Sequence, residues 1–115
     1  GIGEPFIEEI LVNKALAKAG YEDNLVYYYY SLFSTMKTNL SFEEFMTLNV
    51  PWLSLHGIDD YDEKFFLNLK SRFSYKKNYE RDTAGLFEML KGELKGPAVM
   101  KAVRLYRGLY AGNQI

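Results

Sequence analysis

The side chains that could carry out catalysis are few and isolated in the sequence. His56 is the single histidine, and the chain contains no cysteine. A histidine can serve as a general base, but it needs a positioned partner. No serine lies in a nucleophile-elbow motif. Because Trp52, Leu53 and Leu55 precede it, His56 is predicted to be a partly buried structural residue. We therefore expect a protein that is not an enzyme and has no catalytic residue.

Four acidic residues in the middle of the chain could hold a hard cation through their carboxylates. They are Asp59, Asp60, Asp62 and Glu63. Acidic residues are also favoured at helix N-termini, where they interact with the positive end of the helix dipole. A helix predicted over 60–79 therefore explains this cluster without an ion.

A second possible metal site fails on its ligands. The segment Leu40–Phe45 is similar to the exit of a calcium-binding EF-hand loop, which needs oxygen ligands at alternating early positions. Those positions are occupied here by Phe33, Thr35, Lys37 and Thr38, and the lysine would repel the ion. We predict no metal site and no cofactor.

Charge is divided unevenly along the chain. Residues 1–63 contain three basic and eleven acidic residues, a balance of −8, and residues 64–115 contain eleven basic and four acidic ones, a balance of +7. The sum is the net charge of −1. Such asymmetry is typical of polyanion binding or of self-complementary docking. The alternative is that the two halves fold against each other and the surface is mixed.

The basic residues of the second half alternate with aromatic ones, among them Phe73, Tyr75 and Tyr79. Basic side chains could contact phosphates while aromatic rings stack on bases. The residues predicted to do so are Lys70, Arg72, Lys76, Lys77, Arg81, Lys101 and Arg104. The chain has no recognised nucleic-acid-binding motif. The same residues could instead form a solvated face, or dock on the acidic half of a second subunit.

Hydrophobic spacing predicts an all-α fold, a single compact domain (1–115) of five or six helices. Helices are expected over 4–19, 22–37, 42–49 with a short turn over 51–55, 60–79, 83–95 and 97–111. The run 25–33 is almost entirely apolar or aromatic, so we expect an aromatic-rich central helix that neighbours cover on most sides. Its tyrosines also favour a strand, but no second strand is predicted to pair with it. Ser41 and Glu44 have the spacing of a helix-capping box.

The composition also limits the location of the protein. No apolar run approaches the roughly 18 residues that a membrane span needs. The start, Gly1–Glu4, has no signal-peptide pattern and no initiator methionine, so the chain is a tag-cleavage product or a fragment. The absence of cysteine favours a reducing compartment. We expect a cytoplasmic protein with no membrane contact.

Residues 25–58 carry a family resemblance. An aromatic helix is followed by Asn39–Phe45 and then by the spaced apolar residues Leu48, Val50, Trp52 and Leu53. This order resembles the small helical tail-assembly chaperones of long-tailed bacteriophages, over about a third of the chain. The resemblance implies an oligomerising helical protein that binds another phage protein and has no catalytic residues.

Two functions remain after these exclusions. The favoured one is a non-enzymatic protein-interaction or assembly module that also self-associates. Aromatic residues dominate such interfaces, and the predicted anchors are Tyr28, Trp52, Phe73 and Tyr106, which could equally belong to the core. The alternative is a helical nucleic-acid-binding module that uses the basic second half.

Overall fold

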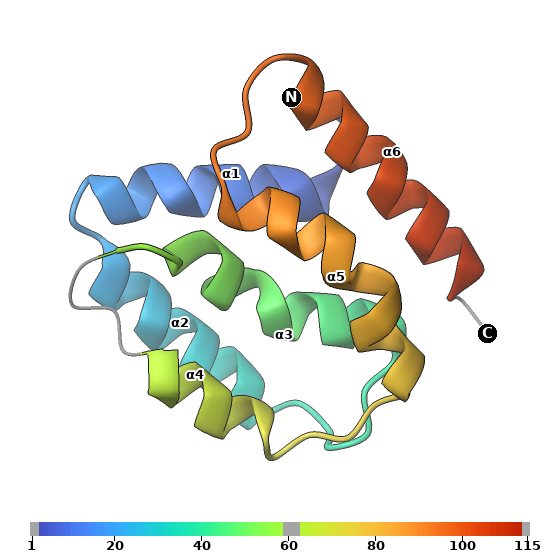
Figure 1. The fold of residues 1–115 in the computed structure, drawn as a ribbon. Coiled ribbons are helices and arrows are strands. Elements are labelled where there is room, and N and C mark those ends of the chain that lie inside the picture. The colour runs from blue at the N-terminus through green and yellow to red at the C-terminus, as the bar shows by residue number, and fades with distance from the viewer. Residues whose placement is uncertain (1–2, 59–62, 114–115) are drawn as a thin grey trace.

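The computed structural model describes residues 3–58 and 63–113, without the side chains of residues 63–65. This part of the chain forms six helices and no β-strand (Figure 1): α1 (Pro5–Lys18), α2 (Glu22–Ser34), α3 (Phe42–Leu55), α4 (Glu63–Lys70), α5 (Lys77–Lys91) and α6 (Pro97–Gly112). The predicted all-α fold with one hydrophobic core is confirmed. None of these helices has the length and hydrophobicity to span a membrane.

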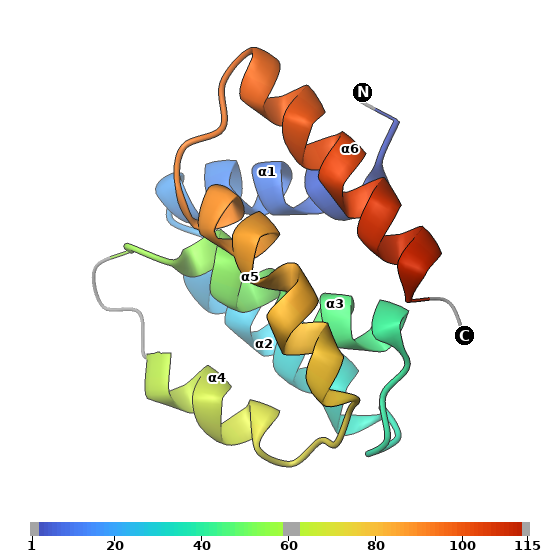
Figure 2. The same ribbon diagram turned by 45° about the vertical axis from the view of Figure 1, so that its right-hand side comes forward.

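Helix α3 is the centre of the fold. It packs against α1, α2, α4 and α5, and Figure 1 and Figure 2 show it between these helices. Ten of its 14 residues are buried. The predicted capping box fixes its start. Ser41 Oγ accepts a hydrogen bond from the Glu44 backbone N–H (3.2 Å), and the Glu44 carboxylate accepts one from the Ser41 N–H (3.0 Å).

Helix α3 continues through Pro51, so the predicted break between 42–49 and 51–55 is wrong. A proline inside a helix removes one backbone hydrogen bond and costs about 3 kcal/mol. The neighbouring Val50, Leu53 and Leu55 are completely buried, and each such side chain contributes about 1.5–3 kcal/mol. Burial on both sides of the proline therefore outweighs its local cost.

The helix predicted over 60–79 ends at Lys70 instead. The loop that follows lies beside residues 38–40. The backbone N–H of Leu40 donates to Ser74 O (2.8 Å), and the Ser74 N–H donates to Thr38 O (2.7 Å). Because these bonds use the backbone groups of Ser74, the loop cannot be helical there. Helix α5 then begins at Lys77, ahead of the predicted start at 83.

The early start of α5 follows from its buried face. Tyr79, Thr83, Leu86 and Leu90 are all buried, and their spacing of four, three and four residues is that of one helix face. Thr83, the first residue of the helix predicted over 83–95, is completely buried. Its hydroxyl donates to Tyr79 O (2.6 Å). The helix must therefore include Tyr79 to bury the whole face.

The aromatic run in α2 is helical, as predicted, and is covered on one face. Tyr29 and Phe33 are 1% and 2% exposed, whereas Tyr27, Tyr28 and Tyr30 are 75%, 57% and 43% exposed. We expected neighbouring helices to cover this run on most sides. The helix that is covered in this way is α3. The difference arises because tyrosine hydroxyls allow large aromatic side chains to remain in water.

One buried polar contact joins α1 to α2. The Tyr29 hydroxyl accepts a hydrogen bond from Asn13 Nδ2 (2.7 Å) and donates one to Glu9 Oε1 (2.5 Å). Asn13 and Tyr29 are both buried. Burial, followed by the hydrogen bond to Glu9, raises the pKa of Tyr29 well above its usual value. The hydroxyl therefore stays protonated and holds the two helices in register.

Replacing Tyr29 by phenylalanine should destabilise the fold, because the buried Asn13 amide loses its acceptor. A buried polar group without a partner costs about 1–3 kcal/mol. We expect urea denaturation to show a loss of that size for Tyr29→Phe. Tyr28→Phe is the matched control, and it should change the unfolding free energy by less than about 0.5 kcal/mol because its side chain is exposed. Equal losses in the two variants would contradict this role of Tyr29.

Candidate functional site

The four aromatic residues predicted as interaction anchors come from four different parts of the fold. Tyr28 is exposed on α2, and Trp52 is half-buried on α3. Phe73 is half-buried in the α4–α5 loop, and Tyr106 is buried on α6. The Trp52 ring has Lys91 Nζ 4.3 Å from its centroid. Only Tyr28 is thus presented as a fully accessible side chain, and Tyr106 contributes to a cavity described below.

The seven basic residues of the predicted nucleic-acid surface do not form one patch. Lys70 is held inside the fold: its Nζ lies 3.6 Å from Glu80 Oε1 and 3.4 Å from Asn49 Oδ1. Arg81 pairs with Asp82 at 3.1 Å. The exposed Arg72, Lys76 and Lys77 lie before or at the start of α5.

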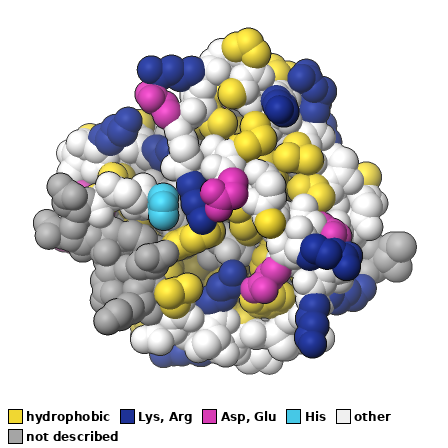
Figure 3. All heavy atoms as spheres, in the orientation of Figure 1, with side chains coloured by type: hydrophobic (Ala, Val, Ile, Leu, Met, Phe, Trp, Pro, Cys, Tyr) yellow, Lys and Arg dark blue, Asp and Glu magenta, His cyan; other side chains and the backbone are white. Residues whose placement is uncertain are grey.

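The remaining two, Lys101 and Arg104, are exposed on α6. Asn113, at the C-terminal end of that helix, bonds to Asn78 of α5 (3.0 Å). At 1.5 Å per residue, Lys101 lies about 18 Å along the helix from this junction. Figure 3 shows basic side chains scattered between acidic and hydrophobic ones on the face seen in Figure 1. That face has the mixed surface that we considered as the alternative to a polyanion site.

The candidate cation cluster lies outside the part of the chain whose side chains are described. This applies to Asp59, Asp60, Asp62 and Glu63, and α4 begins at the last of them. Among the described residues, no three His, Asp or Glu side chains are placed to hold a metal ion.

His56 is exposed, so its predicted partial burial is wrong. It follows α3 directly, and its ring lies 6.0 Å from that of Trp52. It shares a hollow of about 240 Å³ with Lys14, Lys18 and Lys91. This hollow lies where α1, α3 and α5 end, and lysines are favoured at helix C-termini because of the helix dipole.

Lys14 caps the end of a neighbouring helix. Its Nζ donates hydrogen bonds to Leu90 O and Gly92 O at the end of α5. Burial, followed by the neighbouring charge of Lys18, lowers the pKa of Lys14. The last carbonyls of α5 thus receive their hydrogen bonds from a side chain of α1. Helix capping accounts for Lys14, and Lys91 pairs with Glu88 (3.0 Å).

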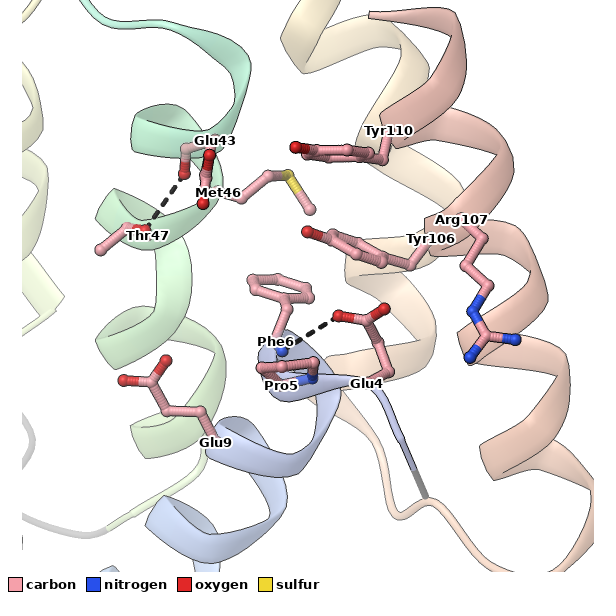
Figure 4. A pocket seen from close by; sticks show the side chains of 10 residues that line it. All are labelled: Glu4, Pro5, Phe6, Glu9, Glu43, Met46, Thr47, Tyr106, Arg107 and Tyr110. Carbon is pink, nitrogen blue, oxygen red and sulfur yellow. Dashed lines mark hydrogen bonds between the residues drawn. The ribbon is translucent and has the colours of Figure 1, made fainter. Parts of the chain in front are cut away.

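A different cavity, of about 360 Å³, lies between α1, α3 and α6 (Figure 4). The Phe6 and Tyr106 rings stack with their centroids 4.9 Å apart and their planes at 15°. The Tyr106 and Tyr110 rings follow at 6.0 Å and 29°. Figure 4 shows both tyrosines pointing from α6 towards α3, with Met46 opposite Tyr110. These rings give the cavity a continuous aromatic wall.

Three carboxylates surround this aromatic wall. Glu4 and Glu9 come from α1 and its N-cap, and Glu43 comes from the first turn of α3. Glu4 Oε1 accepts from the Phe6 N–H (3.3 Å), and Glu9 accepts from Tyr29. None of the three forms an ion pair with a described residue. We call this cavity the acidic hollow.

The Tyr106 hydroxyl lies in this negative environment. Burial raises its pKa to about 12, and the charges of Glu4 and Glu43 add to the shift. The hydroxyl makes no hydrogen bond to any described residue. The Tyr106 hydroxyl therefore stays protonated at physiological pH. It can donate a hydrogen bond to a ligand in the cavity, beside the three carboxylates.

A second hollow, of about 440 Å³, adjoins the first one. The two share Glu43 and Tyr110, and Lys37 and Lys76 line only the second. We call the second cavity the basic hollow and the two together the α3–α6 groove. Helices α3 and α6 contribute to both hollows, α1 to the first, and residues 37–41 and α5 to the second.

The α3–α6 groove has the features of a recognition site. Surface pockets that bind ligands have volumes of about 300–1,000 Å³ and combine apolar walls with a few polar groups. Aromatic faces attract cations within about 6 Å of the ring centre, and carboxylates add direct charge pairing. A lysine or arginine side chain is an organic cation that can make both kinds of contact.

Sequence reasoning identified Tyr106 but not its partners in this site. Tyr106 and Tyr110 are four residues apart, so the helix predicted over 97–111 places them on one face. Glu4 and Glu43 also belong to helix starts, as the N-cap of α1 and in the first turn of α3. The available signal was an acidic residue within two positions of an aromatic one, at Glu4 and Phe6 and at Phe42 and Glu43.

Comparison with known proteins gives no relative: no family model, no curated protein and no solved structure matches the chain. The function must therefore be inferred from the groove itself.

The raised pKa of Tyr106 predicts how stability depends on pH. The unfolded value is near 10 and the folded value about 12, so the neutral form favours folding. This contribution is complete below pH 10 and is lost as the pH rises from 10 to 12. Urea denaturation across that range should show a shallower fall for Tyr106→Phe than for the wild type. Identical slopes would mean that the groove does not perturb this tyrosine.

Proposed function

We propose that this protein is a non-enzymatic protein-interaction and assembly module that holds a segment of a partner protein in the α3–α6 groove. One observation carries the proposal. The acidic hollow combines a stacked aromatic wall with three carboxylates that have no ion-pair partner among the described residues. Arg107 is the single cation in the lining, so the cavity keeps an excess of negative charge that attracts a cationic ligand.

The aromatic wall favours a protein ligand over a small ion. A lysine or arginine side chain can lay its aliphatic stem along apolar rings and keep its charge beside a carboxylate. The half-buried Tyr110 offers ring surface, and the exposed Glu43 lies at the cavity rim. Tyrosine and methionine are also residue types that interfaces favour.

Self-association belongs to the proposal and rests on a different surface. Tyr27, Tyr28 and Tyr30 project from α2 into solvent. Tyrosine provides a large and rigid contact area with little loss of conformational entropy. The resemblance of residues 25–58 to phage tail-assembly chaperones is in line with an oligomer, and it implies that the partner is another phage protein.

The proposal is tested by selecting a displayed library of random 12-residue peptides on the immobilised full-length chain. We expect the selected peptides to be basic and to lose about tenfold or more in affinity on Glu43→Gln, since a charged hydrogen bond contributes about 1.5–3 kcal/mol. Glu88→Gln is the matched control, because Glu88 is an exposed carboxylate on α5 that pairs with Lys91. Peptides that bind wild type and Glu43→Gln equally would show that the groove is not the binding site.

Nucleic-acid binding is the competing outcome. A mixed-sequence oligonucleotide should show no binding that depends on the groove. Affinity for phosphates weakens steeply as the salt concentration rises. Tight oligonucleotide binding with that salt response, lost on a Lys76→Gln/Lys77→Gln double substitution, would replace the proposed function.

A further inference from the structure

We infer that the partner residue held in the acidic hollow is a lysine, whose ammonium donates hydrogen bonds to the Tyr106 hydroxyl and to the carboxylates of Glu4 and Glu43. This inference rests on the proposed function and gives the chemistry of the group that the hollow recognises. It comes from a buried hydroxyl without a partner and from the placement of the acceptors around it.

The Tyr106 hydroxyl is the observation that points to a ligand. Tyr106 is only 8% exposed, and its hydroxyl makes no hydrogen bond to any described residue. Figure 4 shows the side chain pointing from α6 towards α3. Buried polar groups are nearly always hydrogen-bonded, because a buried group without a partner destabilises the fold. This hydroxyl lines a cavity of about 360 Å³ and is therefore placed to bond to a ligand there.

Tyr29 shows how this fold satisfies a buried tyrosine internally. Its hydroxyl accepts a hydrogen bond from the Asn13 amide (2.7 Å) and donates one to Glu9 (2.5 Å). Tyr106 has carboxylates in the same cavity, but the lining residues include no amide side chain that could donate to it as Asn13 does. The ligand that complements Tyr106 therefore brings a donor.

The acidic hollow as a whole is richer in acceptors than in free donors. Glu4, Glu9 and Glu43 contribute three carboxylates. The Thr47 hydroxyl already donates to Glu43 O (3.1 Å). Figure 4 shows the Arg107 side chain on the far side of the tyrosine rings from Glu43. A group that carries several donors and a positive charge therefore matches the hollow best.

The acceptors come from three different elements, and this favours an ammonium over a guanidinium. Glu4 is the N-cap of α1, Glu43 lies in the first turn of α3, and Tyr106 belongs to α6. An ammonium has three donors that point in different directions, so it can reach one acceptor on each element. A guanidinium holds its donors in one plane and pairs best with a single carboxylate through two parallel bonds.

The depth of the two tyrosines also fits a lysine side chain. Tyr110 is half-buried and Tyr106 is buried, so the aromatic wall leads from the surface to the interior. A lysine can lay its four-carbon stem along the Tyr110 ring and keep its charge at the end of the stem. The exposed Glu43 lies at the rim and attracts the cation as it approaches.

The ligand side of the inference is tested with nine-residue peptides with blocked ends, titrated into the ¹⁵N-labelled full-length chain. The central residue is Lys, Arg or Nε-acetyl-lysine in an Ala/Ser background. We expect the Lys peptide to bind about tenfold more tightly than the Arg peptide, as one lost hydrogen bond to a charged group predicts. The acetyl-lysine peptide, which has no charge, should not bind measurably. The amide signals of Glu43, Tyr106 and Tyr110 should shift on binding.

The variant Tyr106→Phe separates a binding role of the hydroxyl from a structural one. It should weaken binding of the Lys peptide about tenfold. Its urea midpoint at pH 7 should equal or exceed that of the wild type, because the hydroxyl that is removed has no partner in the free protein. Tyr75→Phe is the matched control, since the Tyr75 hydroxyl donates to Glu80 outside the groove (2.5 Å), and it should keep the wild-type affinity for the Lys peptide.

Free amines carry the same ammonium group and test its source. We expect n-butylamine, which copies the lysine side chain alone, to shift the same amide signals at higher concentration than the Lys peptide. Spermidine should bind less tightly than the peptides selected from the random library, because it makes no contact with its backbone along the groove.

The outcomes separate this inference from the proposed function. Equal or tighter binding of the Arg peptide, selected peptides without lysine, or a Lys affinity unchanged by Tyr106→Phe would overturn the assignment to lysine and leave the groove as a protein-binding site. Signals that shift only outside the groove would overturn both. Spermidine that binds more tightly than every selected peptide would assign the hollow to a free polyamine and also overturn both.

Discussion

The burial of α3 is the constraint on which the rest of the structure depends. Phe45, Val50, Leu53 and Leu55 are completely removed from water, and each contributes about 1.5–3 kcal/mol. Four other helices pack around this one, so their orientations follow from the faces that α3 offers. The helix tolerates Pro51 for the same reason. Buried polar groups on α3 are satisfied internally, as Ser54 Oγ donates to Val50 O (2.7 Å).

The groove exists because α6 is only partly included in this packing. Three residues of α6 are buried, Ala102, Val103 and Tyr106, against ten of α3. Close packing to α5 fixes one side of α6, and the stack of Tyr106 on Phe6 holds the other side against α1. The space that remains between α6 and α3 is lined by side chains from both halves of the sequence. The uneven charge of the chain thereby becomes a local feature, with three carboxylates of the first half gathered at the acidic hollow.

Local signals in the sequence predicted local structure well. The capping box at Ser41 was correct because both partners lie within one turn, and the tyrosine run was correctly predicted to be helical. Features decided by distant contacts were not predictable in the same way. The helix through Pro51 depends on burial by other helices, and the loop before α5 depends on the pairing of Ser74 with residues 38–40. The groove depends on α1, α3 and α6 meeting, which hydrophobic periodicity does not predict. Of its residues only Tyr106 and Lys76 were therefore predicted as site residues, for different functions.

Hydrogen exchange of the individual backbone amides tests most directly the claim that α3 is the scaffold and α6 the less firmly held wall of the groove. Buried core elements exchange only through global unfolding, and peripheral ones through local opening of lower free energy. We predict that the amides around Val50 and Leu53 open with the full unfolding free energy measured in urea. Those along α6 should exchange at a clearly lower free energy, and those nearest Tyr106 should be the best protected among them. Equal protection of α6 and α3 would contradict the claim, because α6 would then belong to the cooperative core and could not serve as an adaptable wall for a partner.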